Sequence, residues 1–91
     1  MTTVARVTGA ASGFNGNDGL GATVTATATC SSGKVVGGGG DINGNNAKHY
    51  AAITSSYASS ATTWTVIATI VAGNQINGNP PSVTASAVCV S

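Results

Sequence analysis

The chain has 91 residues, three basic and two acidic side chains and a formal net charge of +1, and 42% of its residues are apolar. Binding to nucleic acid by phosphate neutralisation needs several lysines or arginines on one face, so this composition predicts no nucleic-acid partner. No apolar run reaches the roughly 18 residues of a transmembrane helix, which predicts no membrane partner, and the sparse charge is atypical of disorder.

The most regular pattern lies in the first third of the chain. We expect a short strand over residues 2–8, a loop rich in glycine and asparagine over 9–19, and a long strand over 20–30. In the long strand Leu20, the alternating alanines and valine, and Cys30 share one parity, while four threonines fall on the other. Because side chains alternate across a strand, this period of two predicts one buried apolar face, Leu20 included, and one hydroxylated face.

The middle of the chain is interrupted by glycine. A short strand over 34–37 runs into four glycines at 37–40, which permit a bulge, a tight bend or the close passage of another backbone. We then expect a polar loop over 41–48 and a strand over 49–55 with His49 at a strand edge. A turn or extended connection over 56–63 follows.

The last third of the chain contains the most apolar strand. Residues 63–72 are apolar on both faces at the centre, so we expect a central strand or one covered on two sides. A turn over 73–81 leads to a final strand over 82–90. Short strands with Asn-Gly-Asn turns between them, at 15–17, 43–45 and 77–79, predict an all-β fold. We expect a small antiparallel β-sandwich or barrel of about six to seven strands, in one domain covering residues 1–91.

The two cysteines end two of these strands. Cys30 and Cys89 each lie on the small apolar parity, so their thiols point into one interior if the strands are neighbours or face each other across the core. A disulfide closing a loop of about 60 residues would stabilise the fold by roughly 4 kcal/mol in the chain-entropy model. The alternative is two buried reduced thiols. Two cysteines and one histidine cannot make a four-ligand zinc site, and we expect no metal and no cofactor.

The patterns that would indicate catalysis are incomplete. Ser32-Gly33-Lys34 lacks the upstream glycine and the following serine or threonine of a phosphate-binding loop. His49 could pair with Asp18 or Asp41 in a triad, but no serine lies in a nucleophile elbow. The oxygen-bearing residues after Asp41 lack the glycine and glutamate of a helix-loop-helix calcium site, and turn chemistry explains them. The sequence therefore predicts a protein that is not an enzyme.

Aromatic and amide side chains form one candidate binding surface. Tyr50 and Tyr57, with Asn43 and Asn45, have the combination of ring and amide that lectin-like sites use to bind sugars. We expect Trp64 to fill the core opposite the two cysteines, with the tyrosines at a rim.

Three segments resemble a small module of bacterial secreted proteins and phage structural proteins: CSSGKVVGGG from Cys30, SSYASSATTWTV from Ser55 and SVTASAVC from Ser82. In that module C-x-x-G-K-x-x-x-G-G-G is followed by S-Y-P…W-x-V and the module ends V-T-A-x-A-x-C. The resemblance spans residues 26–90 and implies a compact disulfide-paired β-sandwich without catalytic residues. Ala58 stands where the module has proline.

The resemblance, the small size, the scarce charge and a start without an apolar signal segment favour a non-enzymatic structural protein of a phage particle, at the virion surface. We expect a capsid decoration (cement) protein or a small fibre component. Its partners would be major capsid or other virion proteins and copies of itself, in a homo-oligomer for which we expect a trimer. The alternative is a carbohydrate-binding or adhesin module on a virion or in the extracellular space, with surface glycans as partners.

Overall fold

The computed structural model describes residues 3–15, 20–45, 49–73 and 80–91. These residues form seven strands and, within those ranges, no helix: β1 (Val4–Thr8), β2 (Ser12–Gly13), β3 (Thr23–Thr29), β4 (Lys34–Asn43), β5 (Tyr50–Ala58), β6 (Thr63–Ala72) and β7 (Ser82–Val90). The bounds of β6 and β7 are those expected from the sequence. The turns expected at 15–17 and 77–79, together with Asp18, lie wholly or partly outside the described residues.

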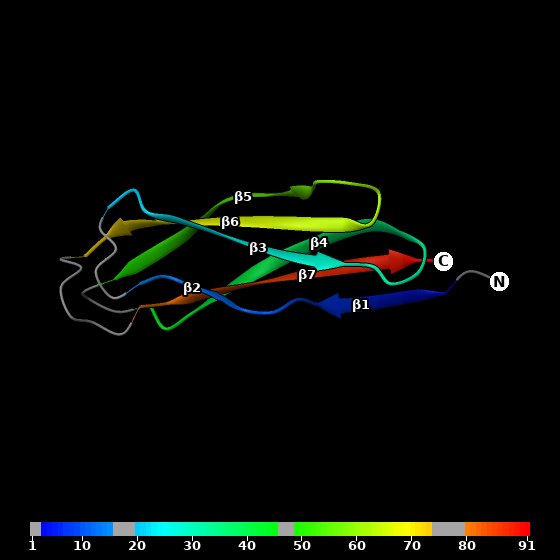
Figure 1. Cartoon of the computed structure of the whole chain (residues 1–91), viewed down its shortest axis with the longest axis horizontal. Coiled ribbons are helices and arrows are strands. Elements are labelled where there is room, and N and C mark those ends of the chain that lie inside the picture. The colour runs from blue at the N-terminus through cyan, green and yellow to red at the C-terminus, as the bar shows by residue number, and fades with distance from the viewer. Residues whose placement is uncertain (1–2, 16–19, 46–48, 74–79) are drawn as a thin grey trace.

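The strands form two antiparallel sheets packed together (Figure 1). In sheet A, β7 is central, with β4 along one side and β1 and β2 in succession along the other. In sheet B, β6 is central between β3 and β5. The fold is therefore the expected all-β sandwich, and the apolar strand at 63–72 is a central strand as predicted. The two ends of the chain lie at the same end of the sandwich, where Thr3 and Ser91 exchange two backbone hydrogen bonds.

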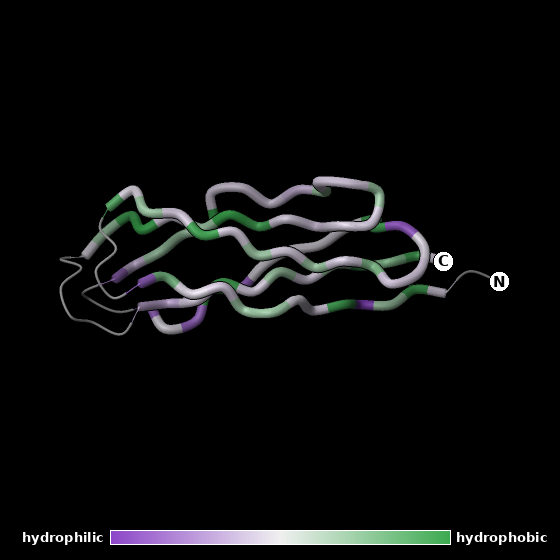
Figure 2. Tube along the Cα trace, viewed as in Figure 1, coloured by the Kyte–Doolittle hydropathy of each residue, from purple (hydrophilic) through white to green (hydrophobic). Residues whose placement is uncertain are grey.

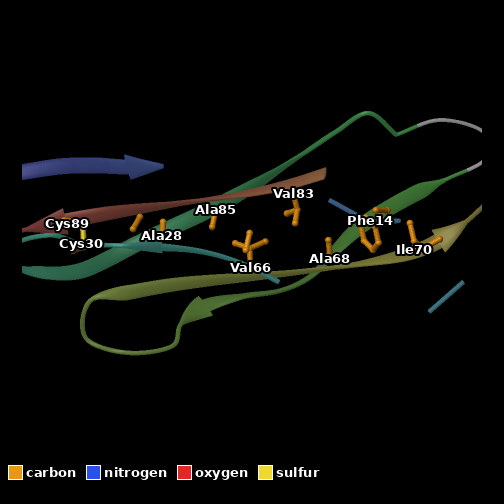
Figure 3. Packing of buried hydrophobic residues seen from close by; sticks show 12 residues of the cluster. Phe14, Ala28, Cys30, Val66, Ala68, Ile70, Val83, Ala85 and Cys89 are labelled. Carbon is orange, nitrogen blue, oxygen red and sulfur yellow. A yellow bond between two sulfur atoms is a disulfide. The ribbon is translucent and has the colours of Figure 1, made fainter. Parts of the chain in front are cut away.

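The core between the sheets is built largely from small side chains. Alternation along β3 and β7 points one parity inward, and Figure 3 shows the inward residues of the two sheets facing each other. Half of the core cluster is alanine; its members are Phe14, Ala26, Ala28, Cys30, Ala51, Val66, Ala68, Ile70, Val83, Ala85, Ala87 and Cys89. Because alanine buries little apolar area, this core stabilises the fold less than one of leucine and isoleucine would.

A disulfide joins Cys30 and Cys89, as expected, with a Cα–Cα distance of 5.8 Å. Cys30 directly follows β3 of sheet B, and Cys89 lies near the end of β7 of sheet A, so the bond links the two sheets across one end of the core (Figure 3). It closes a loop with a sequence separation of 59. The cross-link compensates for the small core, since it restricts the unfolded chain.

The four glycines are part of a strand, which corrects the expected short strand and polar loop. β4 runs unbroken from Lys34 to Asn43, with one irregularity between Val35 and Gly37. The bulge and the close packing are confirmed. A Cβ at Gly38 would lie 2.5 Å from the ring of Trp64, and one at Gly40 would lie 2.8 Å from the side chain of Val66. Two inward glycines thus let sheet B approach the backbone of β4.

Two further expectations from the sequence are wrong. Leu20 is 65% exposed rather than buried, because β3 begins only at Thr23 and Leu20 belongs to a turn in which Gly21 has a φ of 89°. His49, expected as the first residue of a strand over 49–55, lies just before β5 and is completely buried. Residues 56–58, expected in a connection, extend β5.

Candidate functional site

Seven threonines lie on the outer surface of sheet B, together with Ile67 opposite Thr25, and we call the threonines the threonine face. It consists of Thr23, Thr25, Thr27 and Thr29 on β3 and Thr63, Thr65 and Thr69 on β6. Cross-strand pairing brings six of these seven together as Thr23 with Thr69, Thr27 with Thr65, and Thr29 with Thr63. None of the residues of β3, β5 and β6 is charged. The hydroxylated face expected from the alternation of residues 20–30 is thus extended by the threonines of the neighbouring strand, β6.

The threonine face is ordered by hydrogen bonds between hydroxyl groups. The hydroxyls of Thr29 and Thr63 lie 3.2 Å apart, and those of Thr54 and Thr69 lie 3.2 Å apart. Thr65 is buried and donates a 2.7 Å hydrogen bond to the Oγ of Ser59. Alternate residues along a strand are about 6.7 Å apart and neighbouring strands about 4.8 Å apart, so hydroxyl and methyl groups repeat on a grid. Such a surface can pack against another polar, uncharged surface without burying a charge.

The outer surface of sheet A differs in kind, because it holds every charged side chain in the part of the chain that the structure describes. Register places Arg6 of β1 beside Val88, Lys34 of β4 beside Val90, and Asp41 of β4 beside Thr84. These positions have the parity opposite to the buried side chains of β7. Among the described residues, charge is therefore confined to the outer face of sheet A. Figure 2 shows that most of the remaining trace is pale, and so neither strongly hydrophilic nor strongly hydrophobic.

A hollow of about 300 Å³ opens on this charged face. It is lined by Arg6, Gly38, Gly39, Gly40, Asp41, Ser86 and Val88. Gly37 and Gly39, which point outward, have no atom within 4 Å of where a Cβ would stand, and neither has a positive φ. Of these two positions only Gly39 lines the hollow, which its missing side chain leaves open, whereas the inward Gly38 and Gly40 are required by packing. The sequence pattern could not reveal this hollow, since Arg6 of β1 and Asp41 of β4 line it together only because both strands pair with β7.

The residues predicted to bind sugars are divided between the two ends of β5. Tyr50 and Tyr57 are 52% and 47% exposed, but they are seven positions apart on one strand. In a regular strand that separation is about 23 Å, so the two rings do not form one platform for a single sugar. Tyr50 lies at the end of the sandwich that also contains Asn45, whereas Tyr57 pairs with Thr65 of the threonine face.

The amide group of Asn45 is engaged within the fold. Its Nδ2 donates a 3.0 Å hydrogen bond to the carbonyl oxygen of Ala51, and its Oδ1 accepts a 2.9 Å hydrogen bond from the N–H of Ala51. The side chain of Asn45 thus makes two hydrogen bonds to the backbone of Ala51, as the backbone of a neighbouring strand would. Asn43, the last residue of β4, is exposed, and Gly44 has a φ of 89°, which fits the turn expected at 43–45.

Trp64 packs inside the sandwich, as expected. It pairs with Ala28 in the register of sheet B, and its ring lies against Gly38 of sheet A. Its Nε1 donates a 2.9 Å hydrogen bond to the Oγ of Ser56. The indole is therefore a structural bridge between the sheets rather than a surface for stacking a ligand.

Groups that could support metal or acid–base chemistry are few. Among residues 3–15, 20–45, 49–73 and 80–91, no three of the histidine, cysteine, aspartate and glutamate side chains cluster to hold a metal ion. His49 is completely buried, and Asp41 lies on the outside of sheet A. Within the same ranges no helix has the length and hydropathy needed to cross a membrane.

Comparison with known proteins adds no relative: no protein-family model, curated protein or solved structure matches the chain. The function must therefore be inferred from the two outer faces themselves.

Proposed function

We propose that the protein is a non-enzymatic structural protein of a phage particle, a capsid decoration protein or a small fibre component, which acts by packing on neighbouring subunits at the virion surface. The observation that carries this proposal is the uncharged threonine face of sheet B. The similarity of three segments to a module of phage structural proteins supports the assignment to a particle. A disulfide-linked sandwich suits this role, because it holds a flat surface without requiring a large core.

The physical basis is the low cost of desolvating the threonine face. A charged side chain buried against a neighbour must be paired to offset its lost hydration, whereas a hydroxyl needs one hydrogen bond and its methyl group is stabilised by burial. The four threonines of β3 are exposed along an edge strand of sheet B. A neighbouring subunit can therefore contact these side chains along the length of the strand.

The proposal is tested by adding the purified protein to phage shells assembled without it, and measuring co-sedimentation. We expect saturable binding by the native protein. The variant Thr25→Lys places a charge at the centre of the threonine face and should abolish it. Ser82→Lys, on the outward parity of β7 in the other sheet, is the control and should leave binding intact. If the native protein never sediments with shells, or if both variants bind like it, the proposal is wrong.

A carbohydrate-binding or adhesin role is the second candidate, favoured by the exposure of Tyr50 and Tyr57. Each ring would have to bind separately, since they lie at opposite ends of β5. A glycan array, repeated with calcium, tests this role. Binding that Tyr50→Ala or Tyr57→Ala removes would support it, and an array without hits would contradict it.

A further inference from the structure

The outer face of sheet A has an apolar end that nothing in the described chain covers. Val88 and Val90 of β7 are only half-buried on this face, and Val4, which pairs with Val90, is 67% exposed. Val36 in the nearby bulge of β4 is 65% exposed. Exposed valines gathered on a sheet indicate a contact surface, because solvation of apolar area is unfavourable.

The charged side chains of this face lie at three levels of the central strand, with Arg6 level with Val88. Lys34 is level with Val90, whereas Asp41 is level with Thr84 on the same edge strand. Two further outward residues of β7 lie between the levels of Lys34 and Asp41, one on each side of Ala87. Val88 lies on the side toward Lys34. Ser86, which is level with Gly39 of the hollow, lies on the side toward Asp41. A basic group at one end is thus matched by an acidic group at the other, and the hollow between them spans the level of Ala87, since both Val88 and Ser86 line it.

We infer that this face is the contact surface between two copies of the chain, packed face to face around a two-fold axis that crosses the strands at Ala87. Rotation about this axis brings Val90 of one copy to the level of Thr84 of the other. It likewise brings Val88 of one copy to the level of Ser86 of the other. It places Lys34 of each copy over Asp41 of the other. It also places Val88 of each copy at the hollow beside Gly39 of the other. A two-fold contact requires a self-complementary surface, which this arrangement provides.

The outward glycines are the reason for choosing a second copy as the occupant. Glycine is unfavourable in a strand relative to alanine, and neither φ nor packing within the described chain requires it at Gly37 or Gly39. A surface that receives Val88 of a second copy needs this open space. The burial of valines supplies affinity, while the charge pairs fix the orientation of the two copies.

This inference deepens the proposed function, because it names one surface through which copies pack, yet it is tested on the isolated chain. Sedimentation equilibrium of the native protein should show a monomer–dimer equilibrium. Gly39→Thr fills the hollow and should weaken dimerisation at least tenfold. The matched control is Gly13→Thr: Gly13 also has open space around it, but it is level with Ser82, beyond the overlap of the two copies.

The charge arrangement is tested by mixing variants. Lys34→Glu places two acidic groups over each other, and Asp41→Lys places two basic groups over each other, so each variant alone should dimerise about tenfold more weakly. An equimolar mixture should recover native affinity, because each copy then meets an opposite charge. A monomer at every concentration, a trimer, equal effects of Gly39→Thr and Gly13→Thr, or a mixture no tighter than its parts would overturn the inference. Dimers that do not bind shells would refute the proposed function alone.

Discussion

The ring of Trp64 lies directly on the backbone of Gly38, so close that a Cβ there would stand 2.5 Å from two of its ring carbons. Trp64 belongs to the central strand of sheet B and Gly38 to an edge strand of sheet A. The largest side chain of the chain is thus accommodated by the absence of a side chain opposite it. This contact explains why a glycine stands at position 38 within a strand, where glycine is otherwise unfavourable.

Substituting Gly38 and its neighbour should have opposite effects on stability. Gly38→Ala forces the Cβ into Trp64 and the carbonyl oxygen of Ser86, and should lower the free energy of unfolding by about 1–3 kcal/mol. Gly39→Ala meets open space and should raise it by about 0.5–1 kcal/mol. Urea denaturation of both variants, at protein concentrations low enough for the monomer, measures the difference. Equal effects would show that Trp64 does not contact Gly38 in solution.

The disulfide should account for a large part of the stability. The double variant Cys30→Ala/Cys89→Ala releases a loop with a sequence separation of 59, and should lower the free energy of unfolding by about 4 kcal/mol. Treatment of the native protein with a reductant should shift the urea midpoint in the same direction, with the double variant as the control that the reductant leaves unchanged. An unchanged midpoint in the native protein would contradict a closed bond.

Asn45 should stabilise the start of β5 rather than a ligand. Asn45→Ala removes both hydrogen bonds to the backbone of Ala51 and should lower the free energy of unfolding by about 1–2 kcal/mol. The hydrogen exchange of the Ala51 amide should accelerate. Asn43→Ala is the control, because Asn43 is exposed at the end of β4 and should change neither quantity. If the amide of Ala51 exchanges equally in both variants, Asn45 does not hold this strand.

Much of the fold could be predicted because its strands alternate strictly. The threonine parity of β3 and the alanine parity of β7 distinguish the outward from the inward faces by sequence alone, and they place Cys30 and Cys89 in one interior. Apolar residues on both parities at its centre indicate that β6 is a central strand. These signals are local, so they do not depend on which strands pair.

The remainder depends on contacts between distant residues. Glycine has a low strand propensity, so Gly37–Gly40 locally favour a bend, and they are extended because they pair with β7 and because Trp64 and Val66 pack on Gly38 and Gly40. Leu20 shares the buried parity but lies beyond the start of β3. The charged face of sheet A could not be predicted, since Arg6 and Asp41 become neighbours of one hollow only through the pairing of β1 and β4 with β7.

The central claim is that the protein functions by packing its faces on neighbouring subunits. The most direct test is the melting temperature of shells to which the protein has been added, with and without Thr25→Lys. Anything that binds only the assembled shell stabilises it by mass action, so the native protein should raise the melting temperature and the variant should leave it unchanged. A shell that melts at the same temperature with saturating native protein would contradict the claim.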